Sequence, residues 1–236
     1  MRALALVALL LLAGCTPSAT AAHSEAVTVQ RDDVTLRGTL QVPDLAPGER
    51  VPVMILMHGY ASWSDEPHLV RTAEQLAAAG VASLRVDFTG QGQSDGDLGE
   101  FGDAAVTQLD DADAVLAYAQ ALPFAGDISV LGYSLGGLVA ASLAGSHPDD
   151  IASLVLLAPA SPYGVYAPIL RTAQQYRGPV LILQGDSDRL VPVRVAEQYA
   201  AAFEDAELRI LPHENHDFSY GTDVEGMTVR FVTRGG

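Results

Sequence analysis

The sequence predicts an α/β fold, in which a mostly parallel central sheet is covered by helices on both faces. Short, almost wholly apolar runs such as residues 52–57 are typical of strands that are buried on both sides. These runs alternate along the chain with longer helical segments, which is the order of a parallel sheet with crossover helices. With 236 residues, 49% of them hydrophobic, the chain has the size and material for one domain with a sizeable core.

The expected elements follow one another in a strand–helix order. Two opening strands, 26–30 and 34–42, are joined by a tight turn at Asp32-Asp33 and carry charges suited to a sheet edge. Strands are then expected at 52–57, 81–86, 128–131, 151–158, 180–183 and 207–211. Helices are expected at 69–79, 103–122, 135–144, 166–176 and 193–203, the first ended by Gly80 and the second by Pro123.

Charge and cysteine content exclude several classes of function. The net charge of −16 argues against nucleic acid as a partner and against docking on anionic lipid, because both need basic patches. Cys15 is the one cysteine in the sequence, so the chain has no intramolecular disulfide and no cysteine-based metal site.

The first residues have the character of an export signal. Arg2 precedes the apolar run 3–12, which is shorter than the about 20 residues that a membrane span needs. The run ends in Leu12-Ala13-Gly14-Cys15, which resembles the lipobox of bacterial lipoproteins, where cleavage leaves a lipid-modified cysteine. We therefore expect a signal peptide over 1–14, a tether over 15–25, a domain over 26–236, and an extracytoplasmic protein anchored to a bacterial membrane by lipid on Cys15. The alternative is an ordinary secretory signal cut after Ala21 or Ala22.

The pentapeptide Gly132-Tyr133-Ser134-Leu135-Gly136 has the form G-x-S-x-G and lies between an expected strand and an expected helix. In that context the serine occupies a sharp turn that exposes its hydroxyl, and glycines allow the neighbouring backbone to approach closely. A glycine-rich loop with an incidental serine is the alternative. The context favours Ser134 as the nucleophile of a serine hydrolase.

Four separate blocks resemble the α/β-hydrolases, and more narrowly the small bacterial esterases related to cinnamoyl and feruloyl esterases. They are His58-Gly59-Tyr60, the stretch 85–94 with the pattern R-x-D-x-x-G-x-G-x-S, the serine pentapeptide, and the acid and histidine loops at 184–192 and 215–218. The resemblance implies an α/β-hydrolase fold with a minimal cap, because residues 160–178, where such proteins often insert one, leave room for about one helix.

The catalytic triad of this fold follows the chain order Ser, acid, His, which Ser134, Asp188 and His216 obey. Asp186 and His213 compete for the second and third roles. The family pattern G-x-x-D selects Asp188 and H-x-F selects His216, while Asp186 is better suited to capping its turn. The resemblance makes His58 a structural residue that hydrogen-bonds its loop.

The remaining site residues follow from the fold and the resemblance. The oxyanion hole is expected from the backbone N–H groups of Tyr60 and Leu135. Substrate-binding side chains are expected from four aromatic residues, Tyr60, Trp63, Tyr133 and Tyr163.

No cofactor and no metal are expected. Gly90-Gln91-Gly92 is not followed by the third glycine of a dinucleotide-binding loop, and the six histidines form no zinc-binding pair of helical spacing. Three aspartates on the expected helix 103–122, Asp110, Asp111 and Asp113, are interpreted as a solvated face.

The predicted function is hydrolysis of carboxylic esters of small molecules through an acyl-enzyme, with short acyl chains favoured because a short cap leaves the site open. The short cap also counts against an aromatic acid. A serine peptidase or thioesterase would use the same machinery, and a noncatalytic lipoprotein that binds a ligand in a hydrolase-like cleft is the alternative of another class.

Overall fold

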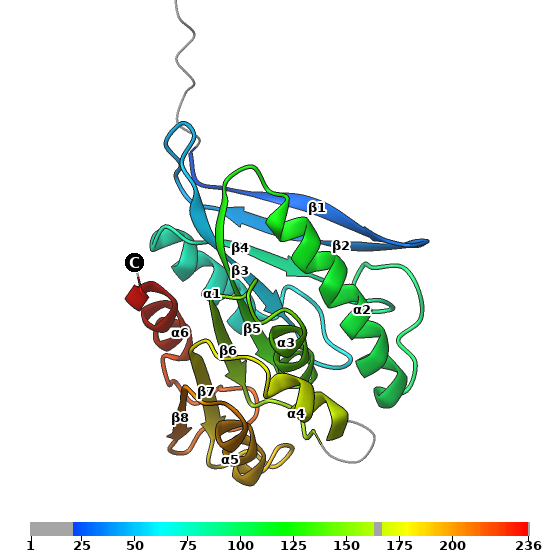
Figure 1. The fold of residues 1–236 in the computed structure, drawn as a ribbon, viewed down its shortest axis with the longest axis vertical. Helices are drawn as coiled ribbons and strands as arrows, with labels where there is room; N and C mark the ends of the chain where they lie inside the picture. Colours follow the sequence, from blue (N-terminus) through cyan, green and yellow to red (C-terminus); the bar gives the residue numbers. More distant parts are fainter. Residues whose placement is uncertain (1–20, 163–166, 236) are drawn as a thin grey trace, which may run out of the picture.

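The computed structural model describes residues 21–162 and 167–235, which form a single eight-stranded sheet with helices on both of its faces (Figure 1). The strand order is β1-β2-β4-β3-β5-β6-β7-β8. The strands are β1 (His23–Arg31), β2 (Val34–Val42), β3 (Val51–Met57), β4 (Ala82–Val86), β5 (Ala125–Tyr133), β6 (Ser153–Leu157), β7 (Val180–Gly185) and β8 (Ala206–Leu211). The helices are α1 (Pro67–Ala78), α2 (Phe101–Gln120), α3 (Leu135–Ser146), α4 (Ala167–Ala173), α5 (Val193–Ala202) and α6 (Val224–Val232), followed by the short 3₁₀ helix η2 (Thr233–Gly235).

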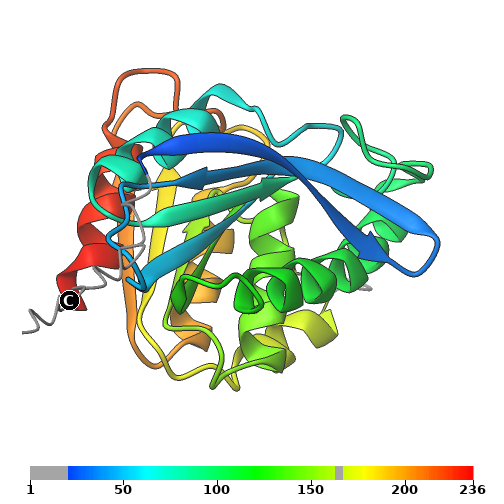
Figure 2. The same cartoon turned by 90° about the horizontal axis from the view of Figure 1, so that it is seen from above.

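The sheet is parallel from β4 to β8, and only β2 pairs with its two neighbours in the antiparallel sense. Helices α1 and α6 cover one face, and α2, α3 and α5 cover the other (Figure 2). The apolar run of β3 reflects this arrangement. Val53 and Ile55 point into one core and Met54 and Leu56 into the other, so every position needs an apolar side chain. The predicted α/β-hydrolase fold is confirmed.

Several elements differ from the sequence-based expectations, most clearly at the ends of the chain and in the loop after β6. β1 begins at His23, so residues 23–25 belong to the sheet and not to the tether, because Val42, Gln41 and Leu40 of β2 supply pairing partners. The helix expected over 166–176 spans Ala167–Ala173, and α6 and η2 were not expected. Residues 1–20, with the lipobox and Cys15, lie outside the described residues, as does Tyr163.

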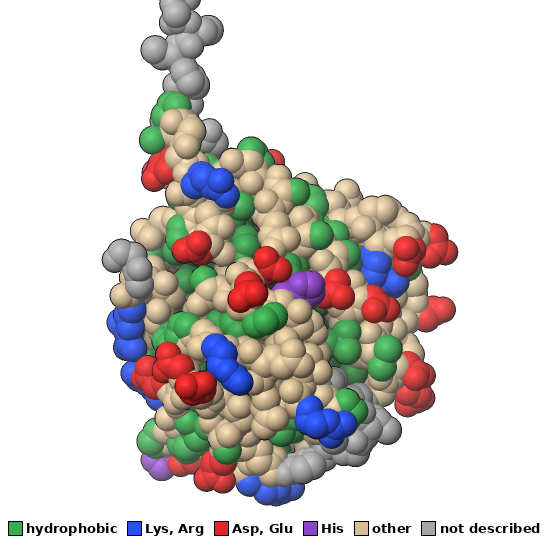
Figure 3. Space-filling model, viewed as in Figure 1, with side chains coloured by type: hydrophobic (Ala, Val, Ile, Leu, Met, Phe, Trp, Pro, Cys, Tyr) green, Lys and Arg blue, Asp and Glu red, His purple; other side chains and the backbone are tan. Residues whose placement is uncertain are grey.

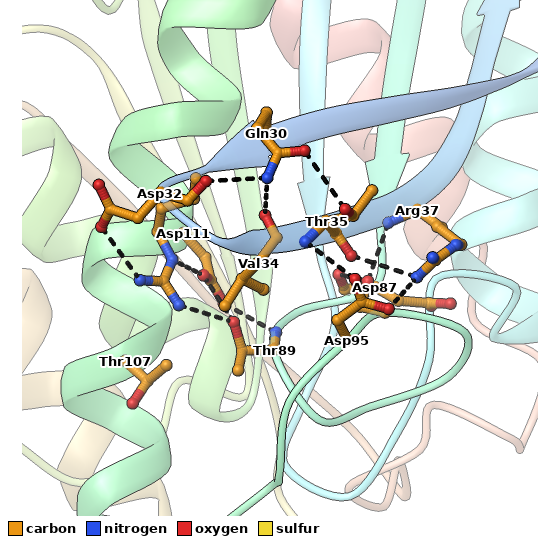
Figure 4. A network of polar contacts seen from close by, with 12 residues as sticks. Gln30, Asp32, Val34, Thr35, Arg37, Asp87, Thr89, Asp95, Thr107 and Asp111 are labelled. Carbon is orange, nitrogen blue, oxygen red and sulfur yellow. Dashed lines mark hydrogen bonds and ion pairs between the residues drawn. The ribbon is translucent and has the colours of Figure 1, made fainter.

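The interpretation of Asp111 as part of a solvated helix face is wrong. Its carboxylate is fully buried and accepts hydrogen bonds from Arg31 Nε at the end of β1 and from the backbone and hydroxyl of Thr89 (Figure 4). A helix position can be charged and buried when a distant segment supplies the opposite charge. Asp111 thus fastens the β1–β2 hairpin and the loop after β4 to α2.

Charged side chains are dispersed over the one face that Figure 3 draws. On the face drawn in Figure 3, acidic side chains are scattered among isolated basic ones, with no basic patch of the kind that nucleic acid binding needs. No helix among the described residues is long and apolar enough to cross a membrane.

Candidate active site

Ser134 occupies the sharp turn between β5 and α3. Its backbone angles, φ 52° and ψ −115°, lie in a region that side-chain-bearing residues rarely adopt. The turn is possible because neighbouring backbone segments approach at glycines: a Cβ on Gly132 would lie 2.2 Å from the carbonyl oxygen of Gly136, and a Cβ on Gly136 2.5 Å from that of Met57. The hydroxyl of Ser134 is thereby presented at the carboxyl end of the sheet.

The structure brings Ser134, His216 and Asp188 together. The Ser134 hydroxyl lies 3.0 Å from His216 Nε2, and His216 Nδ1 lies 2.8 Å from Asp188 Oδ2. His216 follows β8 and is 8% exposed, whereas His213 is exposed and uses its backbone N–H to bind Asp186. Of the two histidines that the sequence left in competition, His216 is the one that lies beside Ser134.

Asp188 is held by four hydrogen-bond donors. Its Oδ1 accepts from the backbone N–H groups of Leu190 and Val191, each at 2.8 Å, and its Oδ2 accepts from Gln184 Nε2 at 2.9 Å as well as from His216. Burial raises the pKa of this carboxyl, but the hydrogen bonds from His216 and the backbone outweigh burial, and the pKa lies below its ordinary value. Asp188 is therefore ionised and fixed in orientation.

Two buried residues that the sequence analysis did not identify shape the loops around the acid and the histidine. Gln184, fully buried at the end of β7, shares Asp188 Oδ2 with His216 and also donates to the carbonyl of Val191. Glu214 is 1% exposed and accepts from the backbone N–H groups of Tyr220 and Thr222. The sequence gives little sign of these roles, because a single Gln or Glu beside a turn is usually a surface residue.

His58 is a structural residue, as the family resemblance implies. It is fully buried, its Nδ1 lies 2.8 Å from the carbonyl oxygen of Gly59, and its Nε2 accepts from the backbone N–H of Phe88 at 3.0 Å. Because Nε2 is an acceptor, the proton resides on Nδ1. Burial lowers the pKa of His58, so the ring is neutral and joins the loop after β3 to the loop after β4.

The block 85–94 anchors neighbouring loops. The carboxylate of Asp87 accepts from the backbone N–H groups of Ser64 and Gln93, at 2.6 and 2.8 Å. Gly92 is required there, since a Cβ would lie 2.1 Å from Asp87 Oδ2. Asp87 thus supports the loop that approaches Ser134 from β3.

Both residues expected to form the oxyanion hole adjoin Ser134. Leu135 is the first residue of α3, where backbone N–H groups have no partner within the helix. Tyr60 follows Gly59, at which a Cβ would lie 3.3 Å from Ser134 Cβ, so the two loops are in contact. Their role as hydrogen-bond donors to the substrate oxygen stays a prediction.

A cavity of about 640 Å³ opens beside Ser134. Of the four aromatic residues expected to bind substrate, Tyr60 and Tyr133 line it, Tyr163 lies outside the described residues, and Trp63 is not among the described lining residues and is 49% exposed. The cavity is lined by Gly59, Tyr60, Ala61, Ser62, Glu66, Phe101, Tyr133, Ser134, Ala160, Ser161, Leu190, Val191, Pro192, Val195, His216 and Asp217.

A second cavity, of about 680 Å³, adjoins the first. Glu66, Tyr133 and Asp217 line both cavities and so form the wall between them. Across the parts of the chain that the structure describes, no group of three or more metal-ligating side chains is assembled.

Residues 48–172 match the family described as "Serine aminopeptidase, S33", Hydrolase_4, and this match extends over more than half of the chain. The chain belongs to this family. As a member of the S33 family it shares its fold with Est1E of Butyrivibrio proteoclasticus, solved with ferulic acid bound. That structure is 25% identical with a TM-score of 0.76, over 87% of this chain and 96% of that one.

Two further relatives carry the names of esterases. The Pyrococcus furiosus esterase Pf2001 superposes with a TM-score of 0.72 at 21% identity, over 90% of this chain and 93% of that one. The pimeloyl-[acyl-carrier protein] methyl ester esterase of Chromobacterium violaceum is 38% identical over 107 residues, which are 45% of this chain. The match spans only 37% of that relative's length.

Proposed function

We propose that this S33-family protein is a serine hydrolase that cleaves carboxylic esters through an acyl-enzyme intermediate. The observation that carries the proposal is the unbroken line of hydrogen bonds from the Ser134 hydroxyl through the imidazole of His216 to the Asp188 carboxylate. Nothing in an ordinary ligand-binding cleft requires a strained serine, an imidazole and a buried carboxylate in this order.

Proton transfer follows from the hydrogen-bond directions. Asp188 is ionised and accepts from Nδ1–H, so His216 Nε2 carries the lone pair that removes the Ser134 proton as the oxygen attacks the ester carbonyl. The resulting imidazolium gives that proton to the departing alcohol as the carbonyl carbon–oxygen bond breaks. Water, deprotonated in turn by His216, then releases the acid from Ser134.

The negative charge that develops on the carbonyl oxygen would be stabilised by the backbone N–H groups of Tyr60 and Leu135. Tyr60 belongs to a loop that is fixed through His58, and Leu135 is held as the first residue of α3. Such fixed donors typically contribute about 10²–10³ each to turnover.

An ester is favoured over a peptide as substrate because the relatives reported above carry esterase names, including one that acts on a methyl ester. The family description names an aminopeptidase, so a peptidase is the second candidate, and a thioesterase is the third. All three would form the same acyl-enzyme, since the triad does not select the leaving group.

Short acyl chains are the proposed preference. The cavity is open, and of the described residues between β6 and β7 only Ala160 and Ser161 line it. Helix α4 packs against the far end of α3, where a Cβ on Gly145 would lie 2.1 Å from the carbonyl oxygen of Thr172. A long chain would therefore extend into solvent, and each unenclosed methylene forgoes about 0.8 kcal/mol of transfer energy.

A fluorophosphonate probe followed by intact-mass measurement tests the serine mechanism. We expect one adduct on the wild-type protein and none on Ser134→Ala, and the labelled protein should no longer hydrolyse p-nitrophenyl acetate. Absence of an adduct on wild type, with no ester, amide or thioester cleaved, would favour the noncatalytic binding protein. Comparison of matched ester, anilide and thioester substrates identifies the leaving group.

We also propose that the protein is exported and held at a bacterial membrane by lipid on Cys15. The support is the charged start, the apolar run and the four-residue motif that ends at Cys15. Lipid chains rather than apolar protein surface would then provide the attachment.

A further inference from the structure

The side chain of Tyr133 ties the strand that carries Ser134 to the loop that carries His216. Tyr133 directly precedes Ser134, and Asp217 directly follows His216. The Tyr133 hydroxyl donates a hydrogen bond to Asp217 Oδ1 over 3.0 Å. This contact joins the same two segments as the Ser134–His216 hydrogen bond but uses neither of those side chains.

The ring of Tyr133 has little freedom to move. It is 6% exposed and lies against the His216 ring, with ring centroids 5.2 Å apart and planes inclined by 40°. The ring of His68 in α1 also contacts it, edge-on, at 4.6 Å. Because the ring is packed on both sides, the hydroxyl has one fixed position, next to the Asp217 carboxylate.

Asp217 directly follows His216 and so supplies a second carboxylate in the same loop, and it differs from Asp188 in being exposed. A carboxylate within about 4–6 Å of an imidazole stabilises the charged imidazolium. If the Asp217 side chain were free to rotate, it would compete with Asp188 for the imidazolium and draw the ring away from Ser134.

We propose that Tyr133 is a positioning residue whose hydroxyl holds the Asp217 carboxylate away from His216, so that Asp188 remains the one acidic partner of the imidazole. The inference rests on the proposed function of Ser134, His216 and Asp188. It assigns the tyrosine a role in addition to lining the cavity.

The hydroxyl remains a donor at every pH at which the protein would work. Burial raises the pKa of Tyr133 far above its ordinary value, and the charge and hydrogen bond of Asp217 add to the effect. The other groups near the imidazole do not replace this role. Burial and the charge of Arg71 lower the pKa of His68 to about 4, so it is neutral, and Glu66 is occupied by the Ser62 hydroxyl. The ionisable side chains facing His216 or the Tyr133 ring are Asp188, Asp217, His68 and Glu66.

Tyr133→Phe removes the hydroxyl and keeps the ring that separates the two cavities. We expect kcat for p-nitrophenyl acetate to fall about tenfold with KM changed less than about twofold, because substrate contacts are retained. The released carboxylate should raise the pKa of the His216 imidazole, followed by NMR, by ~0.5–1 unit, and the acidic limb of the kcat/KM profile should shift by the same amount.

Two changes at Asp217 make the test specific. Asp217→Asn removes the competing charge. Adding Tyr133→Phe to the Asp217→Asn variant should therefore lower kcat by less than about twofold and leave the His216 pKa unchanged. Asp217→Glu lengthens the side chain by one methylene, so the carboxylate no longer lies where the Tyr133 hydroxyl can donate to it. This variant should reproduce the effect of Tyr133→Phe, and its position is exposed, so the substitution does not endanger folding. Tyr220→Phe, the same change at a tyrosine that is 70% exposed in the same loop, is the control and should be silent.

A Tyr133→Phe protein with kcat within twofold of wild type and an unchanged His216 pKa would overturn the proposal. So would equal losses in the wild-type and Asp217→Asn backgrounds, since the hydroxyl would then act through something other than the carboxylate. A wild-type protein that cleaves no ester would refute the proposed function instead, and the NMR titration of His216 would still decide whether Tyr133 restrains Asp217.

Discussion

Asp186 and Asp188 follow the same strand two residues apart, yet only Asp188 reaches the imidazole. Asp188 Oδ2 lies 2.8 Å from His216 Nδ1, while Asp186 Oδ1 accepts the backbone N–H of His213 at 2.8 Å and the hydroxyl of Ser187. One aspartate thus faces the site and the other shapes the turn beside it.

The two aspartates should respond very differently to the same substitution. Asp188→Asn replaces an acceptor of Nδ1–H by a group that can present a donor, so kcat should fall about 10³–10⁴-fold. Asp186→Asn retains an oxygen that can accept the backbone N–H of His213, so kcat should fall less than about fivefold. Steady-state kinetics with p-nitrophenyl acetate checks both, and equal losses would show that the acid is wrongly assigned.

Ser134 should be strained as well as reactive. Ser134→Ala should lower turnover by about 10⁴–10⁶ while the protein remains folded. Ser134→Gly should be equally inactive but about 1 kcal/mol more stable than Ser134→Ala, because glycine tolerates φ 52° and ψ −115°. Urea unfolding measures the difference. In an unstrained position the alanine variant would be at least as stable as the glycine variant.

Acyl-chain length tests the openness of the cavity. In a series of p-nitrophenyl esters, kcat/KM should be greatest for acyl chains of about two to eight carbons and should level off or fall beyond that length. Methyl ferulate, included in the series, should be a poor substrate. A steady rise to twelve or more carbons would reveal an enclosed acyl pocket and contradict the proposed preference.

Stability should fall in mild acid partly because of His68. Its pKa is about 4 in the folded protein against 6.5 for the free side chain, so the unfolded chain binds the proton first as the pH falls from 6.5 towards 4. His68→Phe keeps a ring against Tyr133 and cannot titrate. Between about pH 7 and about pH 4.5 its free energy of unfolding should therefore decrease by roughly 2–3 kcal/mol less than that of wild type. Equal decreases, measured by urea unfolding, would show that His68 does not contribute.

Substitution of Cys15 tests the proposed lipid attachment to a membrane. Wild-type protein expressed with its full N-terminus should partition into detergent and carry the mass of attached lipid. Cys15→Ser should be released or accumulate as unprocessed precursor. The same soluble form for both proteins would contradict the lipobox interpretation and favour an ordinary secretory signal.

The sequence predicted the fold because its local and global patterns agree. Strand β3 is apolar at Val53 and Met54 alike, a pattern that fits a strand covered on both faces. Helix α6 was missed because Val224, Thr228 and Val229 are β-branched and disfavour an isolated helix. Packing against α1 and the Asp223 cap, which accepts from the Gly226 N–H, compensate, and only the cap has a local signal.

In the site, too, residues with a local sequence signal could be predicted, and residues that depend on tertiary contacts could not. Chain order, together with the motifs of the family that the chain resembles, selected the three residues that the structure brings together, Ser134, Asp188 and His216. Gln184 and Asp111 could not be found in that way, because their roles depend on partners brought close only by the folded chain.

The register of the first hairpin sets how the molecule would face any surface to which its N-terminus is attached. His23 lies opposite Val42, and Gln41 lies beside Ser83 near the start of β4, so the chain enters at the amino edge of the parallel strands. Ser134 follows β5 at the opposite edge, about 20 Å further along the strand direction, because Gln41 is level with Ser129 through Ser83 and Met54. A membrane, a resin or a fusion partner joined ahead of His23 would thus support the molecule from behind and leave the cavity open to soluble substrates. Esters embedded in that same membrane would lie on the wrong side of the sheet.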